Sequence, residues 1–339
     1  MDTPEQAALR AALRDLLGRG LGAGAPAGTL WKRMTGELGL TGLAVPESHG
    51  GAGAGLAEIA VAVSETGRVL APVPYLSTAL AGYVLGYGEA DAGDAGAPGE
   101  FLRGIADGSV RAAFAFAGPV IPAGALTVCG GRVSGVASNV LDGACADLFV
   151  VACDDSLWVV WAGDARVTPA GTLDQTRPQA TAEFSSAEAV PVTGVSAAMA
   201  ADLFRVLLAV ESAGAAAHCL DVTVEYLRTR SQFGRALGTF QALRHRCADL
   251  AVEVASATAT ASAAVAGAAD PGVLGPLAKK YCADVFWHVA AEMIQLHGGI
   301  GCTWEHEAHR YLKRAKTTQL VLGSPAELRR LVAARAGLF

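Results

Sequence analysis

Apolar positions in the first third of the chain recur at helical spacing. A helix start at Thr3 is followed by apolar residues three or four positions apart, namely Ala8, Leu9, Leu13, Leu16 and Leu17. The pattern breaks over residues 43–55, where proline and four glycines predict a loop, and it resumes at Leu56. We therefore expect an N-terminal helical domain over residues 1–110.

The pattern of apolar and polar residues changes twice after this domain. Short runs rich in valine and aromatic residues, punctuated by glycine, aspartate and proline, predict β-strands and a central β-domain over residues 111–195. Long helical patterns return in a C-terminal bundle over residues 196–339, with helices expected at 198–230, 240–266, 271–296 and 326–336. Helices, then strands, then helices indicate an α+β fold.

Composition narrows the classes of partner and compartment. The net charge of -6 disfavours both nucleic acid and an anionic membrane as partners. No uninterrupted run approaches the roughly 18 to 20 apolar residues of a membrane span, and the acidic N-terminus lacks the features of a secretory signal, so a cytoplasmic location is expected. Seven scattered cysteines without a CxxC pair predict neither a disulfide framework nor a structural zinc site.

One basic stretch stands out against this acidic background. Residues 226–246 contain five of the chain's 26 lysines and arginines, namely Arg228, Arg230, Arg235, Arg244 and Arg246. A guanidinium makes fork-like, charge-assisted hydrogen bonds to phosphate oxygens, so the stretch is a candidate anion site. For all but Arg230, a solvated helix face is the competing interpretation. The three C-terminal histidines His297, His306 and His309 lack a metal-like set of partners and are treated as non-ligands.

Three stretches together resemble the acyl-CoA dehydrogenase family. They are LGLTGLAVPESHGGAGAGLAEIAVAVSETGR at 38–68, YLRTRSQFGRALGTFQALRHRCADL at 226–250, and QLHGGIGCTWEHEAHRYLKRAKTTQLVLGS at 295–324. Their order and spacing match the family over nearly the whole chain. The resemblance implies N-terminal helices, a central β-domain and a C-terminal four-helix bundle.

The resemblance also implies a cofactor and the residues that hold it. In this family FAD lies between subunits, and the QFG and Q..GG motifs reach the adenosine-pyrophosphate half of a flavin held mainly by a neighbour. The matching cofactor-binding residues here are Arg230, Gln232, Phe233, Gln241, Gln295, Gly298, Gly299 and Ser324. Glycines let backbone N–H groups approach an anion, although Gly298 and Gly299 could instead only end a helix.

The catalytic carboxylate implied by the family is missing. The family reaction needs a base for the α-proton of an acyl-CoA thioester. Most members carry it as the glutamate of a YEGT sequence, where this chain has Leu322, and others carry it just before an arginine that matches Arg205, where this chain has Phe204. The catalytic residue is therefore unknown. Glu211 is either a substitute base or a carboxylate of helix packing or an interface.

The segments that contact the flavin ring in the family also depart from its pattern. The TEP..GSD segment is replaced by FAFAGPVIPAGAL at 114–126, and Gly135–Ser138 stand where aromatic and hydroxyl groups are expected. These differences suggest that this subunit's own pocket for the flavin ring is degenerate. The residues for the adenosine-pyrophosphate half of a neighbour's FAD, in contrast, are retained.

Three hypotheses follow from this contrast. In the first, the chain is the partner of a paralogous subunit that carries the catalytic glutamate, as in the α2β2 steroid-side-chain acyl-CoA dehydrogenases of the family, and acts on an acyl-CoA. In the second, it is a homomeric acyl-CoA dehydrogenase or related flavoenzyme with an unrecognised base. In the third, it is a flavin-free scaffold subunit.

Overall fold

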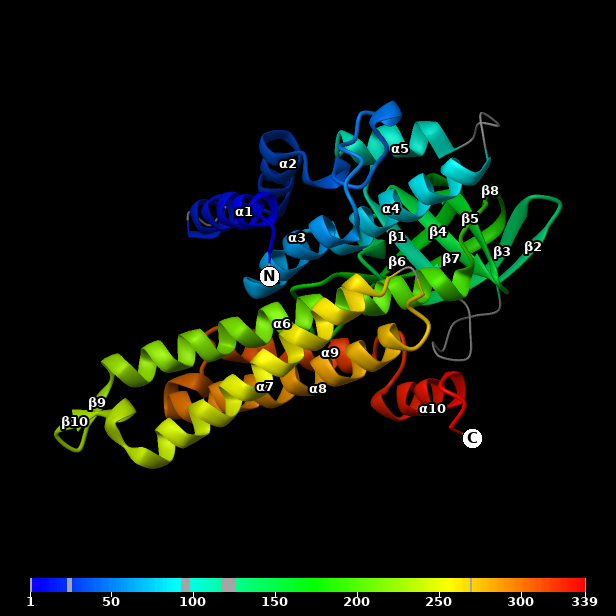
Figure 1. The fold of residues 1–339 in the computed structure, drawn as a ribbon. Coiled ribbons are helices and arrows are strands. Elements are labelled where there is room, and N and C mark those ends of the chain that lie inside the picture. Colours follow the sequence, from blue (N-terminus) through cyan, green and yellow to red (C-terminus); the bar gives the residue numbers. More distant parts are fainter. Residues whose placement is uncertain (1, 23–25, 93–97, 117–125, 269, 339) are drawn as a thin grey trace. The chain divides into compact units, whose positions relative to one another are not determined.

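The computed structural model describes residues 2–22, 26–92, 98–116, 126–268 and 270–338 (Figure 1). The chain forms two compact units. The first comprises Met1–Val63 with Ala71–Phe204, and the second comprises Ser64–Leu70 with Arg205–Phe339. The three segments expected from the sequence pattern appear in order as helices, strands and helices, which confirms the α+β class. The expected borders near residues 110 and 195 stay predictions.

Five helices open the first unit. They are α1 (Pro4–Gly22), α2 (Ala27–Leu38), α3 (Leu56–Arg68), α4 (Tyr75–Ala92) and α5 (Pro98–Ala106), of which the end of α3 belongs to the second unit. Thr3 and Gln6 cap α1 reciprocally, each side chain accepting from the other residue's backbone N–H. Leu13, Leu16 and Leu17 are buried, as their spacing predicts. The predicted loop contains only the short 3-10 turn η2 (Glu47–His49).

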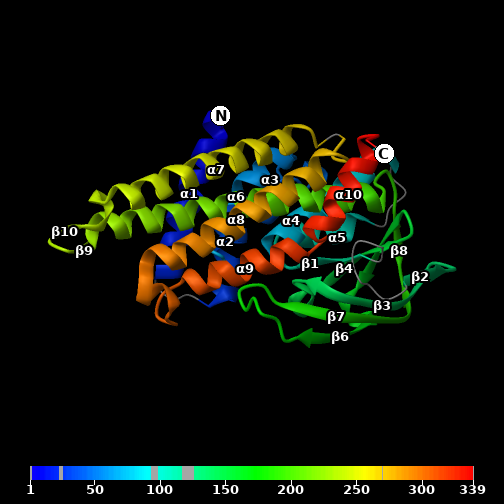
Figure 2. The same cartoon turned by 90° about the horizontal axis from the view of Figure 1, so that it is seen from below.

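Two four-stranded sheets follow (Figures 1 and 2). One has the order β1-β4-β5-β8, built from Ala112–Phe116, Leu148–Cys153, Ser156–Trp161 and Val190–Val192, and β1 is parallel to β4. The other has the order β2-β3-β7-β6, built from Leu126–Cys129, Arg132–Leu141, Gln179–Glu188 and Ala165–Ala170, and it is antiparallel throughout. A shared apolar core includes the edge-to-face pair Phe149 and Phe184, whose centroids are 5.7 Å apart.

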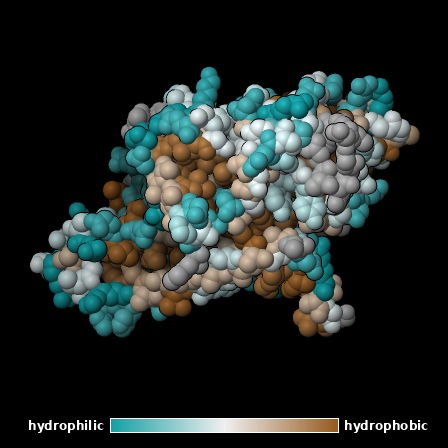
Figure 3. Space-filling view, turned by 45° about the horizontal axis from the view of Figure 1, so that its top comes forward, coloured by the Kyte–Doolittle hydropathy of each residue, from teal (hydrophilic) through white to brown (hydrophobic). Residues whose placement is uncertain are grey.

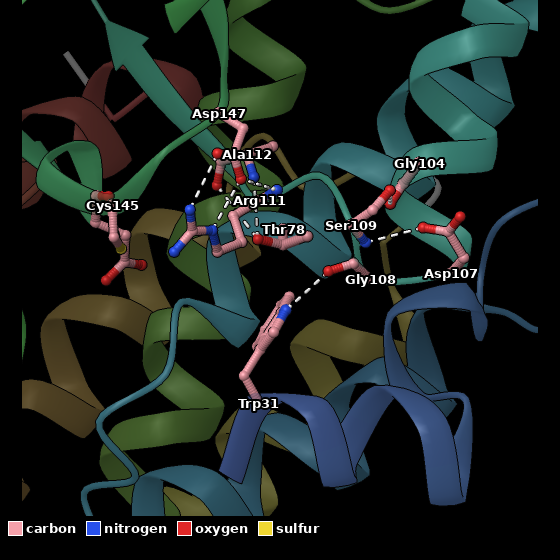
Figure 4. A network of polar contacts seen from close by, with 11 residues as sticks. Trp31, Thr78, Gly104, Asp107, Gly108, Ser109, Arg111, Ala112, Cys145 and Asp147 are labelled. Carbon is pink, nitrogen blue, oxygen red and sulfur yellow. Dashed lines mark hydrogen bonds and ion pairs between the residues drawn. The ribbon is translucent and has the colours of Figure 1, made fainter. Parts of the chain in front are cut away.

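A polar network ties the helices of the first unit to the start of β1 (Figure 4). Arg111 binds Asp147 in a fork, with Nε 2.8 Å from Oδ2 and Nη2 3.0 Å from Oδ1. The Thr78 hydroxyl of α4 accepts from the backbone N–H of Ala112 at 3.1 Å. These contacts fix where β1 enters the sheet, so the network is structural.

The second unit is a helical bundle. Its long helices are α6 (Ala197–Thr229, which begins in the first unit), α7 (Gln241–Ala266), α8 (Leu274–His297) and α9 (Ala308–Leu320), followed by α10 (Pro325–Arg335). The bounds of four of them lie within three residues of the expected ones, whereas α9 was not expected as a helix. Helix α8 packs between α7 and α9 (Figure 2).

By length and composition alone, helix α6 could cross a membrane, although it contains no uninterrupted apolar run of the length of a membrane span. The helix also carries Arg205 and Glu211, whose buried side chains bond to Leu322 and Arg314. Within the apolar window, 83% of the residues are buried inside the structure. Helix α6 is therefore a core helix.

Candidate functional site

A short hairpin after α6 carries the QFG motif. Strands β9 (Ser231–Gln232) and β10 (Arg235–Ala236) are joined by Phe233 and Gly234, whose φ angles are 54° and 77°. Two positive φ angles are the signature of the tight turn that suits a hairpin, but a phenylalanine there costs about 1 kcal/mol. The Phe233 side chain is nevertheless 89% exposed. The chain thus bears backbone strain to hold an aromatic ring in solvent, which is typical of a residue with a binding role.

Arg230 lies at the base of this hairpin. Its backbone N–H donates to the Tyr226 carbonyl and its own carbonyl accepts from the Leu237 N–H, both at 2.8 Å, so its backbone is fixed. Its side chain is exposed and has no carboxylate partner among the described residues. By contrast, Arg246 pairs with Glu292.

The other members of the basic stretch differ from one another. The Arg235 guanidinium lies 4.0 Å from the centroid of the Phe240 ring, a cation–π contact. Arg228 and Arg244 are exposed, as a solvated face requires. Gln232 is exposed beside Phe233, and Gln241, the first residue of α7, is exposed with its side-chain amide 3.0 Å from His245 Nε2.

The glycines of the Q..GG motif occupy their positions for different reasons. Gly298 has φ 65° and ψ −139°, a conformation that essentially only glycine adopts. A Cβ added at Gly299 would meet nothing within 4 Å, so this position faces open space. At Gly301 a Cβ would lie 2.6 Å from the Ile294 carbonyl oxygen, which makes Gly301 a packing glycine. Gln295 is exposed on the last turn of α8.

The fold brings the two motifs to the same end of the bundle. The Tyr226 and His297 rings stack with centroids 4.4 Å apart, and the Tyr226 hydroxyl donates to the His297 carbonyl at 3.3 Å. Arg230 follows Tyr226 by one helical turn, and Gly298 directly follows His297. An exposed guanidinium, an exposed ring and accessible glycine backbone therefore occur at the same end of the bundle, which suits the phosphates and adenosine of a dinucleotide tail.

Ser324 lies elsewhere in the same unit. It caps α10 in a capping box with Glu327: its backbone N–H donates to Glu327 Oε2 at 2.8 Å, and its side chain accepts from the Glu327 N–H. The preceding residue, Gly323, is bound to Lys279. Lys279 stands 16 residues before Gln295 on α8, about 24 Å along the helix from the end that carries the Q..GG motif. The Ser324 hydroxyl thus caps α10, and the structure does not bring Ser324 together with Arg230.

Neither family base position carries a carboxylate. Leu322 is 3% exposed, has φ 55°, and its carbonyl oxygen accepts from Arg205 Nε at 3.0 Å. Phe204 is buried edge-to-face against Phe114 and Phe116, with centroids 5.6 and 5.9 Å away. Both positions are therefore filled by apolar side chains within packed surroundings.

A buried lysine supports the turn that contains Leu322, and sequence reasoning missed it. Lys279 is 1% exposed, and its Nζ donates to the carbonyl oxygens of Gln319 at 2.9 Å and Gly323 at 2.6 Å. Burial, aided by the nearby positive charge of Arg205, lowers the pKa of Lys279 to about 7. A sequence signal existed, because Lys279 falls on the same helical face as the buried Cys282, Ala283 and Phe286.

Glu211 has a packing role in this structure. It is buried, and its Oε1 accepts from Arg314 Nη1 at 3.0 Å, an ion pair that joins α6 to α9. Gly67 presses against it so closely that an added Cβ would lie 2.5 Å from Glu211 Cγ. This arrangement supports the helix-packing interpretation over a substitute base.

The segments expected at the flavin ring are only partly visible. Of the 114–126 segment, residues 117–125 lie outside the described part of the chain. Gly135–Ser138 belong to strand β3, where Gly135 has φ 124° beside a register shift. No aromatic side chain is present in this stretch.

Within the described ranges, no group of three or more His, Cys, Asp or Glu side chains could hold a metal ion.

Comparison with known proteins identifies the class. Residues 3–109 match the acyl-CoA dehydrogenase N-terminal domain, and residues 193–337 match the acyl-CoA dehydrogenase C-terminal domain. The chain belongs to the acyl-CoA dehydrogenase family, a family of oxidoreductases, which confirms the resemblance of its three motifs.

Individual relatives refine this picture. The chain is 37% identical to acyl-CoA dehydrogenase IpdE2 of Mycobacterium tuberculosis over 89% of this chain and 85% of that protein. It is 35% identical to acyl-CoA dehydrogenase FadE34 of the same organism, over 87% of this chain but only 40% of FadE34. Among solved structures, a variant of the Tcur3481-Tcur3483 steroid ACAD matches 99% of each chain with a TM-score of 0.86 and 28% identity.

Proposed function

We propose that this chain is an FAD-dependent acyl-CoA dehydrogenase subunit that completes the flavin site of a catalytic partner. The partner is a paralogous subunit with the catalytic glutamate, and the reaction is α,β-desaturation of an acyl-CoA. The observation that carries the proposal is a contrast within one unit: Arg230, Phe233 and Gly299 are exposed and unobstructed, whereas Leu322 fills a family base position.

The residues at the bundle end fit a dinucleotide tail. Arg230 would bind pyrophosphate oxygens, because its guanidinium has no competing carboxylate among the described residues. Gly298 and Gly299 would admit the tail to their backbone N–H groups, and Phe233 would cover its apolar part. Bound FAD supplies the hydride acceptor of the family reaction. Gln232, Gln241 and Gln295 are exposed amides near the same motifs and remain cofactor-binding candidates, whereas Ser324 is kept as a capping residue.

Leu322 argues for a partner. An α-carbon next to a thioester is a weak acid, so its deprotonation needs a positioned base. Leucine and phenylalanine at the two base positions cannot accept a proton, and Glu211 is engaged by Arg314. The carboxylate is therefore supplied by another chain.

The comparisons support a two-unit enzyme. The solved relative is named as the pair Tcur3481-Tcur3483, and FadE34 is matched over 40% of its length, which leaves room for a second unit of similar size in that protein. A steroid-derived or otherwise bulky acyl-CoA is the substrate we favour, because that solved relative is a steroid ACAD. We keep a cytoplasmic location as part of the proposal.

Side-chain deletion in the complex tests the tail assignment. Arg230→Ala should weaken FAD retention about 10- to 100-fold, the size expected for one charge-assisted phosphate contact. Arg228→Ala, two residues away on the same stretch, is the matched control and should retain FAD as the natural chain does. Equal flavin content in both variants would remove Arg230 from the site.

A further inference from the structure

Two histidine rings close the segment that bears the Q..GG glycines. His297 precedes this segment and His306 ends it, and their ring centroids are 4.3 Å apart. His297 also stacks on Tyr226 of α6. The segment 298–306, which includes the 3-10 turn η6 (Gly298–Cys302), is thus joined end to end by the contact between the two histidine rings, and Tyr226 links this contact to α6.

A hydrogen bond defines which nitrogen of the neutral His297 ring carries the hydrogen. Its Nδ1 lies 2.7 Å from the Met293 carbonyl oxygen, which can only accept, so Nδ1 carries the hydrogen and the neutral ring has its lone pair on Nε2. The residue is 3% exposed, and Nε2 has no partner among the described residues. Protonation would place a charged N–H in a buried position without an acceptor. In keeping with this, burial lowers the pKa of His297.

His306 has the complementary constraint. Its Nδ1 accepts from the backbone N–H of Ala308 at 3.1 Å, at the first turn of α9. An imidazolium has no lone pair, so protonation of His306 would abolish this bond. It would also place a positive charge at the positive end of the helix dipole.

The surrounding charges cannot compensate for this. Glu307 is the carboxylate beside the pair, but its Oε1 lies 3.1 Å from His218 Nε2 of α6. The other titratable or charged groups around them include Tyr226 on α6 and, on α9, the cation Arg310 and the imidazole of His309, which interacts electrostatically with His306. Glu307 can neutralise only one positive charge, so protonation of His218, His297 and His306 leaves an excess of positive charge around it.

We propose that His297 and His306 form a proton-sensitive latch: neutral rings hold segment 298–306 against the bundle, and protonated rings release it. The latch itself depends only on contacts within this chain. Its consequence, that acid weakens binding of the FAD tail, rests on the proposed function, because Gly298 and Gly299 lie on the released segment.

Hydrogen exchange of the full chain at several pH values tests the latch without flavin or partner. After correction for intrinsic exchange rates, protection of the amides in 298–306 should fall about tenfold between roughly pH 7.5 and 5.5, the range in which histidines titrate. His306→Asn keeps an acceptor for the Ala308 N–H but cannot be charged, and His297→Phe keeps the stack on Tyr226. In each variant, the fall in amide protection of 298–306 between these two pH values should be smaller than in the natural chain.

His288→Asn is the matched control, because His288 lies on α8 like His297 but in an exposed pair with Glu253. This variant should show the same fall in amide protection with pH as the natural chain. Equal loss of protection in the natural chain and in His306→Asn would overturn the latch and leave the proposed function intact. If protection falls as expected but the complex retains FAD equally well at both pH values, the latch stands. Only its proposed effect on binding of the FAD tail is then overturned.

Discussion

The guanidinium Nε of Arg205 donates to the carbonyl oxygen of Leu322 at 3.0 Å, which joins the residue after one family base position to the other base position. Arg205 is 4% exposed, and Leu322 has a left-handed backbone with φ 55°. The turn at the position of the YEGT glutamate in the family pattern is thus a fixed structural element here, with an apolar side chain.

This contact predicts a stability effect. Arg205→Met should lower the free energy of unfolding by about 1–3 kcal/mol, because the Leu322 carbonyl is left buried without its donor. Arg329→Met, at an exposed arginine of α10, should change it by less than about 0.5 kcal/mol. Urea unfolding monitored by circular dichroism measures both, and similar values for the two variants would show that the buried contact contributes little.

Lys279 predicts an unusual pH dependence. Its pKa is about 7 in the folded chain, below the ordinary value of 10.5, so between these pH values the unfolded state binds more protons. The contribution of Lys279 to the free energy of unfolding should therefore rise with pH from about 7 to about 10. Lys279→Met should remove that rise, whereas Lys280→Met, in a partly exposed pair with Asp284, should keep it. Denaturant titrations at several pH values check this slope, and an unchanged slope in Lys279→Met would exclude the assignment.

Two adjacent glycines separate fold from binding. Gly298→Ala should destabilise the chain by about 1–3 kcal/mol, because its backbone conformation suits only glycine. Gly299→Ala should leave stability within about 0.5 kcal/mol, since its Cβ would meet nothing within 4 Å. In the complex, however, Gly299→Ala should lower FAD retention, because the methyl group occupies the space proposed for the tail. Full FAD retention by this variant, measured by flavin absorbance after gel filtration, would place the tail elsewhere.

The contact between α3 and α6 depends on small residues. A Cβ at Gly214 would lie 2.3 Å from the Ser64 carbonyl oxygen, so Gly214→Ala should lower the melting temperature by several degrees through a loss of about 1–3 kcal/mol. In contrast, a Cβ at Gly18 of α1 would meet nothing within 4 Å, and Gly18→Ala should stabilise by about 0.5–1 kcal/mol. Calorimetry distinguishes the two signs.

The sequence predicted the parts of the fold that follow from local periodicity. Helix α3 begins at the expected Leu56, and α7 ends at the expected Ala266, because apolar spacing and glycine or proline breaks are local signals. Helix α9 was missed because the stretch around Arg310 and Lys313 is strongly basic and was interpreted as a motif alone.

The site was predicted only where the motif itself carries it. Arg230, Phe233 and Gly299 could be named from the sequence, and the structure places them on elements that meet at one end of the bundle. The hydrogen bonds from Lys279 to Gly323 and from Arg205 to Leu322 span 44 and 117 residues of sequence, and no local pattern encodes such pairings. For the same reason the contact between His297 and His306 was visible only as two histidines without metal partners.

The flavin-to-protein ratio of the chain purified alone and together with its glutamate-bearing paralogue tests the central claim most directly. The account predicts little flavin and no acyl-CoA dehydrogenase activity for the chain alone, and for the active complex one FAD for every two chains, which the partner's carboxylate serves. A homo-oligomer with one FAD per chain that desaturates an acyl-CoA would contradict it. So would a fully active complex without flavin.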